Sequence, residues 1–341
     1  MAGPLLRPLW NASERRLRAP WRFLLFGAAL ALVFAAVGVV ARRVPPSLVA
    51  AVVRPLPPAV VASTLVRRAA ATVGAAVVLT LLVVLAALVV DRRSVSDYGL
   101  GVDRDWWLDC GFGLALGAAL MTLVFAAEYA AGWVAVTGTF VASGPLSFGP
   151  AFLAAVVLFL AVGFAEELLL RGYVLTNVAE AFRVFGDRTA VGVAVVGSSA
   201  LFGALHAANP GATAVSTAVV GLGGVLLALG YILTGDLAIP VGLHVTWNLF
   251  QGPVYGFPVS GVDPRVSVLV LDRTGPTLAT GGAFGPEAGL VGVGAMVVGG
   301  VAVVAYVRRR YGELAVAPVA VPRLRWWRWA RPVPTEGDGE G

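Results

Sequence analysis

Charge is scarce in this sequence, and lysine is absent. Only 13% of its 341 residues are charged and 58% are hydrophobic, whereas about 25% of the residues in soluble domains are charged. All 25 basic residues are arginine, and they crowd the flanks of apolar runs. This composition excludes an ordinary soluble enzyme and is typical of a membrane protein. We therefore expect the lipid bilayer as a partner, and no nucleic acid.

Cysteine is almost absent, since Cys110 is the only one. A single thiol excludes an internal disulfide, and its place in an apolar run predicts a packing role. The 42 glycines and 21 prolines are spread among Ala, Val and Leu runs and are not concentrated in polar tracts. The chain is therefore predicted to be folded.

Long apolar runs dominate what is present. A transmembrane helix needs about 20 mostly apolar residues, and eight windows of the sequence meet this condition. They are approximately residues 23–41, 69–90, 108–134, 149–168, 189–208, 213–234, 238–257 and 288–307. We therefore predict an all-α fold, a polytopic membrane helical bundle of about eight transmembrane helices.

The distribution of arginine predicts the orientation of this bundle. With eight spans, 18 arginines fall on the side of the N-terminus and 7 on the other side, and arginine is enriched on the cytoplasmic side of membrane proteins. Both termini of this multi-pass protein of the cell membrane are thus expected in the cytoplasm. Residues 42–68 hold five arginines on the nominally outer side, and we interpret them as an interfacial or re-entrant segment.

A carboxylate inside an apolar run indicates a structural or functional role, because a charge at mid-bilayer costs about 2.5 to 3.5 kcal/mol on insertion scales. Glu166 and Glu167 directly follow the apolar run 152–164, and they point about 100° apart on a helix. Glu167 stands four residues before Arg171, the favoured order for a helical ion pair, which leaves Glu166 free for another face. The alternative is an ordinary charged membrane boundary with Arg171 reaching the headgroups.

Both histidines of the chain lie in or beside predicted spans. His206 follows Phe202 by one helical turn, and Asn248 follows His244 in the same way. A lone buried histidine is usually a packing residue, but an amide without a partner in hydrocarbon costs a few kcal/mol. Side chains of Glu, His, His and Asn on three spans can satisfy one another only around a polar intramembrane cavity.

Two other acidic residues have simpler interpretations. Glu128 stands alone in the third span and is a packing, interfacial or functional residue. Asp236 follows Thr234 and Gly235 between two spans, a combination that favours a tight turn.

The three polar motifs together resemble the CPBP family, the CAAX proteases and bacteriocin-processing enzymes, which includes the type II CAAX prenyl endopeptidases. The family pattern is Glu-Glu-x-x-x-Arg, then Phe-x-x-x-His, then His-x-x-x-Asn. The chain matches this pattern in order with Glu166, Glu167 and Arg171, then Phe202 and His206, then His244 and Asn248. The resemblance covers about residues 145–257, with weaker echoes at residues 98–100 and 285–287.

The resemblance implies an intramembrane endopeptidase whose site is sunk in the bilayer. Glu166 with His206 would activate water, while His244 and Asn248 would bind the oxyanion. Three further side chains would support the site: Glu167, Arg171 and Phe202. We favour a mechanism without metal or other cofactor, because the zinc motif His-Glu-x-x-His is absent. The alternative is a metalloprotease that holds zinc with Glu166, His206 and His244.

The predicted spans, the charge distribution and the resemblance together divide the chain into five predicted parts. They are a basic cytoplasmic lead (1–22), N-terminal membrane helices (23–144), a catalytic core of the CPBP type (145–257), a loop with the last membrane helix (258–307), and a cytoplasmic tail that is basic and aromatic and then polar (308–341). Within the tail, residues 325–331 are expected to anchor at the membrane surface.

The predicted spans place two site residues at different depths. Glu166 lies near the end of the span 149–168, whereas His206 lies about 17 residues into the next span, near the opposite side. They can meet only if the helix that carries Glu166 continues within the protein to about residue 185. The sequence then predicts a helix of some 36 residues, about 54 Å long.

The expected substrate is a membrane-associated or lipidated peptide or protein. One rival function is a transporter or channel, but such folds often contain internal repeats, and the segment that begins at Glu166 has no duplicate. A second rival is a non-catalytic membrane scaffold or immunity-type protein that uses the same fold. Replacing Glu166 with glutamine separates catalysis from scaffolding, because only a protease loses its effect.

Overall fold

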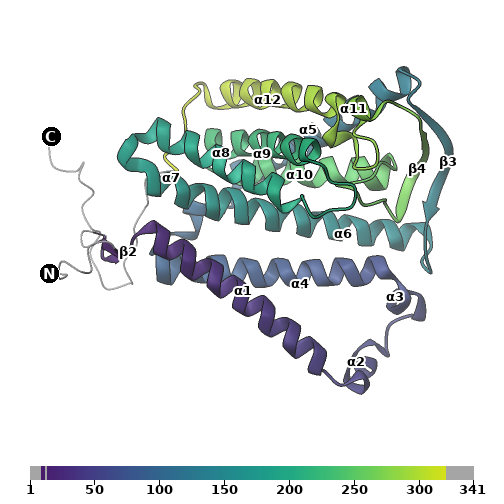
Figure 1. Cartoon of the computed structure of the whole chain (residues 1–341), viewed down its shortest axis with the longest axis horizontal. Helices are drawn as coiled ribbons and strands as arrows, with labels where there is room; N and C mark the ends of the chain where they lie inside the picture. The colour runs from purple at the N-terminus through teal and green to yellow at the C-terminus, as the bar shows by residue number, and fades with distance from the viewer. Residues whose placement is uncertain (1–8, 12–13, 320–341) are drawn as a thin grey trace.

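The computed structural model describes residues 9–11 and 14–319, and most of them are helical. The α-helices are α1 (Ala19–Arg43), α2 (Pro46–Val53), α3 (Pro58–Ala62), α4 (Thr64–Leu85), α5 (Arg104–Ala130), α6 (Phe148–Glu167), α7 (Thr176–Phe182), α8 (Asp187–Leu205), α9 (Ala214–Thr234), α10 (Ala238–Leu249), α11 (Thr277–Thr280) and α12 (Leu290–Tyr311). The π-helical segments are η2 (Ala86–Asp91), η4 (Leu168–Leu175) and η6 (Phe250–Val254), and the 3-10 turns are η3 (Val95–Tyr98), η5 (Arg183–Phe185) and η7 (Pro286–Ala288). Figure 1 shows the long helices side by side in one bundle, with α1 diverging from α4.

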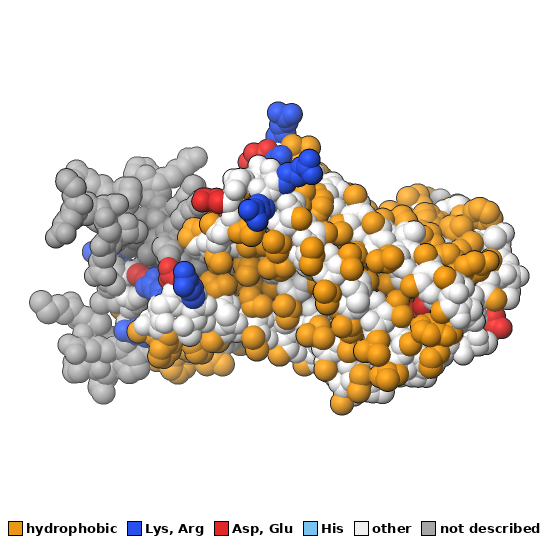
Figure 2. All heavy atoms as spheres, turned by 90° about the horizontal axis from the view of Figure 1, so that it is seen from above, with side chains coloured by type: hydrophobic (Ala, Val, Ile, Leu, Met, Phe, Trp, Pro, Cys, Tyr) orange, Lys and Arg blue, Asp and Glu red, His pale blue; other side chains and the backbone are white. Residues whose placement is uncertain are grey.

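In the described part of the chain, seven helices are long and apolar enough to cross a membrane. They are α1, α4 with η2, α5, the helix that runs from α6 to η5, α8, α9 and α12. Their outer faces are rich in apolar side chains, as Figure 2 shows for one side of the bundle, and Leu32 and Val301 are 72% and 66% exposed. Helices that satisfy their own backbone groups can present such faces to lipid. The predicted polytopic helical bundle is thereby confirmed, and the chain is a multi-pass membrane protein.

The predicted span 238–257 forms α10 and η6, which lie in the interior of the bundle. Ten of the twelve residues of α10 are buried, and the helix packs against α5, α6 and α9. Gly113 and Gly117 of α5 permit close contact, because a Cβ at either position would lie 2.4 Å from a backbone oxygen of α10. A mostly apolar helix can be buried by protein as well as by lipid, and α10 is buried by protein.

The long helix predicted around Glu166 is confirmed. The segment Phe148–Phe185 is one helical run of 38 residues, about 57 Å at 1.5 Å per residue. Its middle is the π-helical segment η4, which begins directly after Glu167. Single π-helical turns inside α-helices are frequent at functional sites.

One end of the bundle carries a pair of strands that the all-α prediction omitted. β3 (Val134–Ala142) and β4 (Val266–Arg273) pair antiparallel, with Val134 opposite Arg273 and Ala142 opposite Val266. Both segments are rich in valine, a good β-former, but they lie far apart in the sequence, so no local turn indicated the pairing. A second, shorter pair joins β1 (Trp10–Asn11) and β2 (Arg16–Leu17).

The opposite end contains a buried group of charges, which we name the N-terminal ion cluster. The Glu180 carboxylate accepts hydrogen bonds of 2.7, 2.6 and 2.5 Å from the guanidinium groups of Arg16, Arg22 and Arg93. Arg22 also lies 3.0 Å from Asp91. All five side chains are buried. Two arginines of the predicted basic lead thus join β2 and α1 to η2 and α7, a role that their sequence pattern did not predict.

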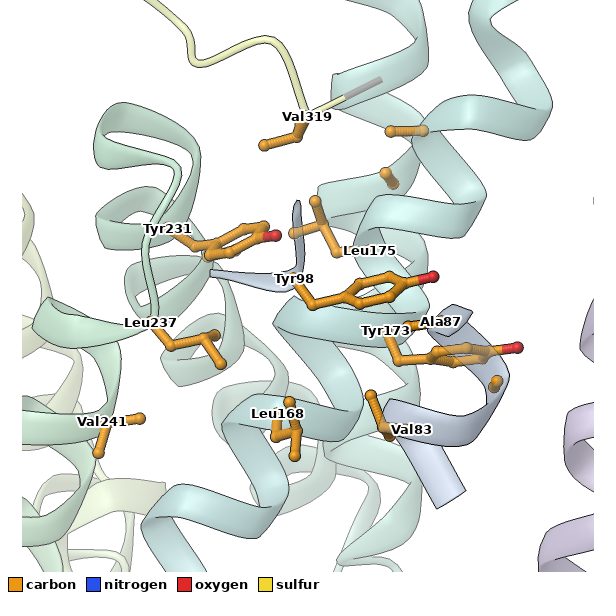
Figure 3. Packing of buried hydrophobic residues seen from close by; sticks show 14 of the residues in the cluster. Val83, Ala87, Tyr98, Leu168, Tyr173, Leu175, Tyr231, Leu237, Val241 and Val319 are labelled. Atoms are coloured by element: carbon orange, nitrogen blue, oxygen red, sulfur yellow. The ribbon is translucent and has the colours of Figure 1, made fainter. Parts of the chain in front are cut away.

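A tyrosine-rich core lies between this cluster and the middle of the bundle, around η4 (Figure 3). Tyr98, Tyr173 and Tyr231 are all fully buried. The Tyr98 hydroxyl donates to Asp91 at 2.6 Å, and the Tyr231 hydroxyl lies 2.8 Å from that of Thr176. Tyr98 and Tyr231, whose hydroxyls are bonded, combine apolar packing with a fixed orientation, whereas Tyr173 of η4 has no hydrogen bond from its hydroxyl in the described part of the chain and packs by its ring against Phe26 and Tyr98.

Several smaller predictions can also be compared with the fold. Cys110 is buried beside Trp106 and Ala238, as a packing residue should be. The backbone N–H of Asp236 donates to the Thr234 hydroxyl at 3.2 Å, which confirms the turn. Residues 42–68 form α2, α3 and the start of α4, and their place at the membrane stays a prediction. Residues 1–8, 12–13 and 320–341, including the predicted anchor at 325–331, lie outside the described residues.

Candidate functional site

The four residues predicted to carry the chemistry line one cavity. Its volume is about 270 Å³, and its walls include Glu166 of α6, His206 at the end of α8, and His244 and Asn248 of α10. We name it the motif cavity. The four side chains share one cavity, as the sequence predicted. The predicted spans alone had placed Glu166 and His206 at different depths in the membrane.

The turn between two antiparallel helices explains the common depth. Glu166 stands 20 residues before Gly186, and His206 stands 20 residues after it. Gly186 has φ +88°, a conformation that glycine adopts without strain, and it joins the long helix to α8 without a longer loop. Since both helices rise about 1.5 Å per residue, the two side chains return to the same level of the bundle.

Glu167 links two of the sequence motifs through one carboxylate oxygen. Its Oε1 lies 3.0 Å from Arg171 Nη1, as the i, i+4 spacing predicted, and 2.8 Å from His244 Nδ1. A carboxylate accepts, so His244 Nδ1 carries the proton in this bond. The Nε2 atom of His244 then lies on the side of Glu166, 4.0 Å from its Oε2.

Arg171 supports the site through contacts with three other residues. Besides Glu167, it donates to the backbone oxygen of Gly224 in α9 at 2.8 Å, and its guanidinium lies 4.7 Å from the centre of the Phe202 ring. Gly224 permits this approach, because a Cβ there would lie 3.3 Å from Arg171 Nη2 and closer still to Ser199. The buried guanidinium thus ties η4 to α8 and α9.

His206 is oriented by the end of its own helix. The backbone N–H of His206 bonds to Gly203, which leaves the carbonyl of Phe202 without its usual helical partner. The side-chain Nδ1 lies 2.7 Å from that carbonyl oxygen. Because a carbonyl only accepts, Nδ1 carries the proton, and Nε2 of the neutral ring is left as an acceptor. Phe202 also packs its ring against His206 and His244, at 4.8 and 5.8 Å between ring centres.

Glu166 and Asn248 keep polar atoms open to the cavity. The Glu166 side chain is 35% exposed, and Asn248 is half-buried. Neither side chain has a hydrogen bond to another residue in the described part of the chain. The sequence predicted that the four polar residues would satisfy one another, but they surround a space in which a bound molecule can reach them.

The alternative zinc site is not assembled in this geometry. Within residues 9–11 and 14–319, no three His, Cys, Asp or Glu side chains are grouped closely enough to hold a metal ion. Glu166 and His244 approach each other at 4.0 Å, whereas the side chain of His206 contacts Phe202 through both its Nδ1 atom and its ring. The residues proposed as zinc ligands therefore do not form a ligand set.

Sequence reasoning missed a second carboxylate in the wall of the motif cavity. Glu287 of η7 is 6% exposed and lines the cavity. Its Oε1 accepts the backbone N–H of Ser260 at 2.6 Å, and its Oε2 accepts a short hydrogen bond from Gln251. Burial raises the pKa of Glu287 to about 7. The signal for it was the weak echo at residues 285–287, which carried no role by itself.

Glu287 holds a strained loop against the cavity. Ser260 has φ +48°, which is unfavourable for a residue with a side chain, and Val259, Ser260 and Val262 all line the motif cavity. Gln251 reinforces the loop by donating to the Pro258 oxygen at 2.5 Å. Such backbone strain persists only where neighbouring contacts impose it, and the Glu287 carboxylate supplies one of those contacts.

Glu128 lies outside this site. Its side chain is 1% exposed and borders a separate cavity of about 420 Å³ near β4, together with Trp133 and Arg273. None of the motif residues lines that cavity. Glu128 therefore serves below as a control for the loss of a buried carboxylate.

Comparison with known proteins agrees with the motifs. Residues 148–250 match the family model described as type II CAAX prenyl endopeptidase Rce1-like, a range that contains all seven predicted site residues. No curated protein and no solved structure matches the chain. The resemblance of this chain to the CPBP family of CAAX proteases is therefore confirmed, and it rests on residues 148–250.

Proposed function

We propose that the chain is an intramembrane endopeptidase that hydrolyses peptide bonds of membrane-associated or lipidated substrates. The observation that carries this proposal is the motif cavity, where Glu166, His206, His244 and Asn248 surround a common space. A match to a CAAX prenyl endopeptidase family supports it. A glutamate mechanism fits the residues better than zinc, because the three candidate ligands are not grouped.

Water activation is assigned to Glu166 and His206. Glu166 takes a proton from a water molecule, and His206 Nε2 accepts the second hydrogen bond of that water. The water oxygen attacks the scissile carbonyl carbon, and Glu166 returns the proton to the leaving nitrogen as the C–N bond breaks. Such general acid–base catalysis contributes about 10² to 10⁴ in rate, and the Nδ1 contact of His206 fixes the tautomer that it needs.

Stabilisation of the oxyanion is assigned to His244 and Asn248. The Asn248 amide donates directly, and His244 donates from Nε2 in its imidazolium form, which the Glu167 carboxylate at 2.8 Å balances in charge. Both residues are fixed in the buried helix α10, so the donors are positioned before the substrate arrives. Glu167, Arg171 and Phe202 hold the two histidines in place.

The membrane placement follows the distribution of arginine. We propose that the chain lies in the cell membrane with both termini in the cytoplasm, as the charge bias predicts. The N-terminal ion cluster then lies at the cytoplasmic end and β3 with β4 at the outer end. The motif cavity opens between them at the middle of the long helix, where lipid-anchored substrates can reach it.

The proposal is tested with the full-length protein purified in detergent and with quenched peptides, with and without an attached lipid. We expect the wild type to cleave at least one set and His206→Ala to lose about 10² to 10⁴ in kcat/KM. The matched control is Glu128→Gln, which removes a buried carboxylate from the other cavity and should keep the wild-type rate. Equal rates for the wild type and His206→Ala would refute the proposed site.

A non-catalytic scaffold is the competing function. The biological effect of the Glu166→Gln variant distinguishes it from catalysis. Glu166→Gln preserves the shape of the side chain and removes its ability to take a proton. Loss of the effect at unchanged protein level supports catalysis. Retention of the full effect supports a scaffold or immunity-type protein and overturns the proposed function.

A further inference from the structure

A tight hairpin forms one wall of the motif cavity. Val259 and Val262 exchange two backbone hydrogen bonds of 2.9 and 3.0 Å, and Ser260 and Gly261 between them have φ +48° and +79°. Positive φ at both central residues is typical of a two-residue hairpin turn. We name residues 259–262 the wall hairpin, because Val259, Ser260 and Val262 line the cavity.

The tip of the wall hairpin is held by other segments of the chain. The backbone N–H of Gly261 donates to the carbonyl oxygen of Phe284 at 2.7 Å, and that of Ser260 donates to Glu287 Oε1 at 2.6 Å. A Cβ at position 261 would overlap the backbone oxygen of Pro210, in the turn between α8 and α9. The tip therefore occupies a space that admits only glycine at this position.

Glu287 also joins the wall hairpin to the helical run that carries Asn248. The side-chain nitrogen of Gln251, three residues after Asn248, donates to Glu287 Oε2 and, at 2.5 Å, to the Pro258 oxygen. Gln251 is fully buried, and its Oε1 has no hydrogen-bond partner in the described part of the chain. Because these two bonds orient the buried amide, the Glu287 carboxyl group fixes the hairpin from two sides, through Ser260 and through Gln251.

The position of the wall hairpin decides how much space the cavity offers. Most of the other lining residues belong to the packed helices α6, α9 and α10, whereas the hairpin keeps an unfavourable φ at Ser260 only while neighbouring contacts impose it. Valine is stiff about χ1, so Val259 and Val262 follow the backbone. A cavity of about 270 Å³ is small for a ligand site, and a shift of one wall changes a large share of it.

We propose that Glu287 is a positioning residue that, through the wall hairpin, limits the size of the substrate side chain next to the cleaved bond. This inference rests on the proposed function. Held in place, Val259 and Val262 leave room in the cavity for a small side chain and exclude a large aromatic one. Without the Glu287 carboxyl group the hairpin yields, and the cavity accepts both.

The competing role for Glu287 is support of the fold alone. A merely structural residue changes the fraction of folded protein, which lowers the measured rate for every substrate by the same factor. The ratio of kcat/KM between a small and a bulky substrate does not depend on that fraction. This ratio therefore distinguishes a positioning residue from a structural one.

The experiment uses pairs of peptides that differ only at one central position, alanine or tryptophan, with purified full-length protein in detergent. Mass spectrometry locates the cleaved bond, and kcat/KM is compared for pairs in which this bond adjoins the varied position. We expect the wild type to prefer alanine by on the order of tenfold to a hundredfold, the usual penalty for overpacking a closed site. Glu287→Ala should bring this ratio close to one, mainly through a lower KM for the tryptophan peptide.

Three further variants make the test specific. Glu287→Gln keeps an acceptor oxygen for the N–H of Ser260, so its ratio should lie between those of the wild type and Glu287→Ala. Val259→Ala trims the wall with Glu287 in place and should also lower the ratio, which keeps the wall testable if Glu287→Ala does not fold. The matched control is Glu128→Ala, which removes a buried carboxylate from the other cavity and should keep the wild-type ratio.

Each outcome supports or overturns the role of Glu287. Equal cleavage of both peptides by the wild type overturns the size limit and leaves the proposed function intact. An unchanged ratio in Glu287→Ala, or in Val259→Ala where the former does not fold, also overturns it. Absence of any cleavage contradicts the proposed function instead. Binding of the same pairs, measured by fluorescence anisotropy, then tests the size limit alone: a preference for alanine that Glu287→Ala removes supports it, and equal affinities for the wild type overturn it.

Discussion

The molecule contains two buried groups of charged residues that differ in how their charges are balanced. In the N-terminal ion cluster, Glu180 contacts three arginines within 2.7 Å, and its side chain is 7% exposed. At the motif cavity, Glu167 is likewise buried and paired, but its neighbour Glu166 is 35% exposed, and among the described residues its nearest ionisable partner is His244 at 4.0 Å. One cluster is closed on itself, and the other leaves a carboxylate open to a cavity.

This difference distinguishes structural charges from those available for chemistry. A buried charge without an oppositely charged partner destabilises the fold by several kcal/mol. Charged side chains that serve only stability are therefore expected to be paired. A group that must accept a proton or bind a substrate has to keep an open face instead. The comparison predicts that variants of the open group change turnover, whereas variants of the closed group change stability.

The largest effect is expected at the open carboxylate. Glu166→Gln should lower kcat/KM by about 10² to 10⁴, because the base that activates water is lost. Its melting temperature should be close to that of the wild type, since the Glu166 side chain makes no hydrogen bond in the described part of the chain and its contact with His244 is as long as 4.0 Å. Turnover and thermal unfolding are measured on the same preparation. A stable Glu166→Gln protein that cleaves at the wild-type rate would remove the distinction between the two groups.

The closed cluster should respond in the opposite way. Glu180→Gln leaves three buried guanidinium groups without their shared carboxylate, which should destabilise the fold by about 3 to 5 kcal/mol. Unfolding in detergent measures this loss, and the folded fraction should still cleave at the wild-type rate. Glu313→Gln, an exposed glutamate, is the control and should unfold like the wild type. A stable Glu180→Gln protein with reduced turnover would contradict the structural role.

A smaller loss is expected at the proposed oxyanion site. Asn248→Ala should lower kcat by about 10² to 10³, the usual cost of removing one donor to an oxyanion. Asn248→Asp keeps the size of the side chain but cannot donate when ionised, so it should lose as much. The kcat values of both variants and of the wild type are measured by steady-state kinetics with one peptide. Full activity of the Asp variant would show that donation from this position is not used.

The smallest effect concerns the dependence of stability on pH. Burial raises the pKa of Glu287 from its ordinary value of 4.5 to about 7, so the folded protein keeps a proton that the unfolded chain releases near pH 4.5. Raising the pH from 5 to 8 should therefore destabilise the wild type, by less than about 3 kcal/mol from this group. Glu287→Gln cannot ionise and should show a shallower decline in melting temperature. Parallel curves for the two proteins would contradict a raised pKa.

Local patterns in the sequence predicted much of the site but little of what surrounds it. Helical spacing sufficed for the Glu167–Arg171 pair and for the contact between the rings of Phe202 and His206, because both are contacts within one helical turn. The length of the helix around Glu166 followed from the requirement that it meet His206. These predictions depend on spacing and burial cost, which a sequence displays directly.

The parts that escaped prediction depend on contacts between distant segments. No pattern in the sequence linked Glu180 to Arg16, and only the fold brings them together. Glu287 acquires its place in the cavity wall only through Gln251 and Ser260. The burial of α10 could not be told from a membrane span, because lipid and protein interiors select the same apolar residues.

Glu166 and His206 acting on one water molecule is the central claim, and a double-mutant cycle tests it most directly. The kcat/KM values of the wild type, Glu166→Gln, His206→Ala and the double variant are compared with one peptide. Residues that act as a unit give strongly non-additive losses, so the double variant should be little slower than the slower single variant. Losses that multiply in full would show that the two side chains act independently, and the proposed mechanism would then be wrong.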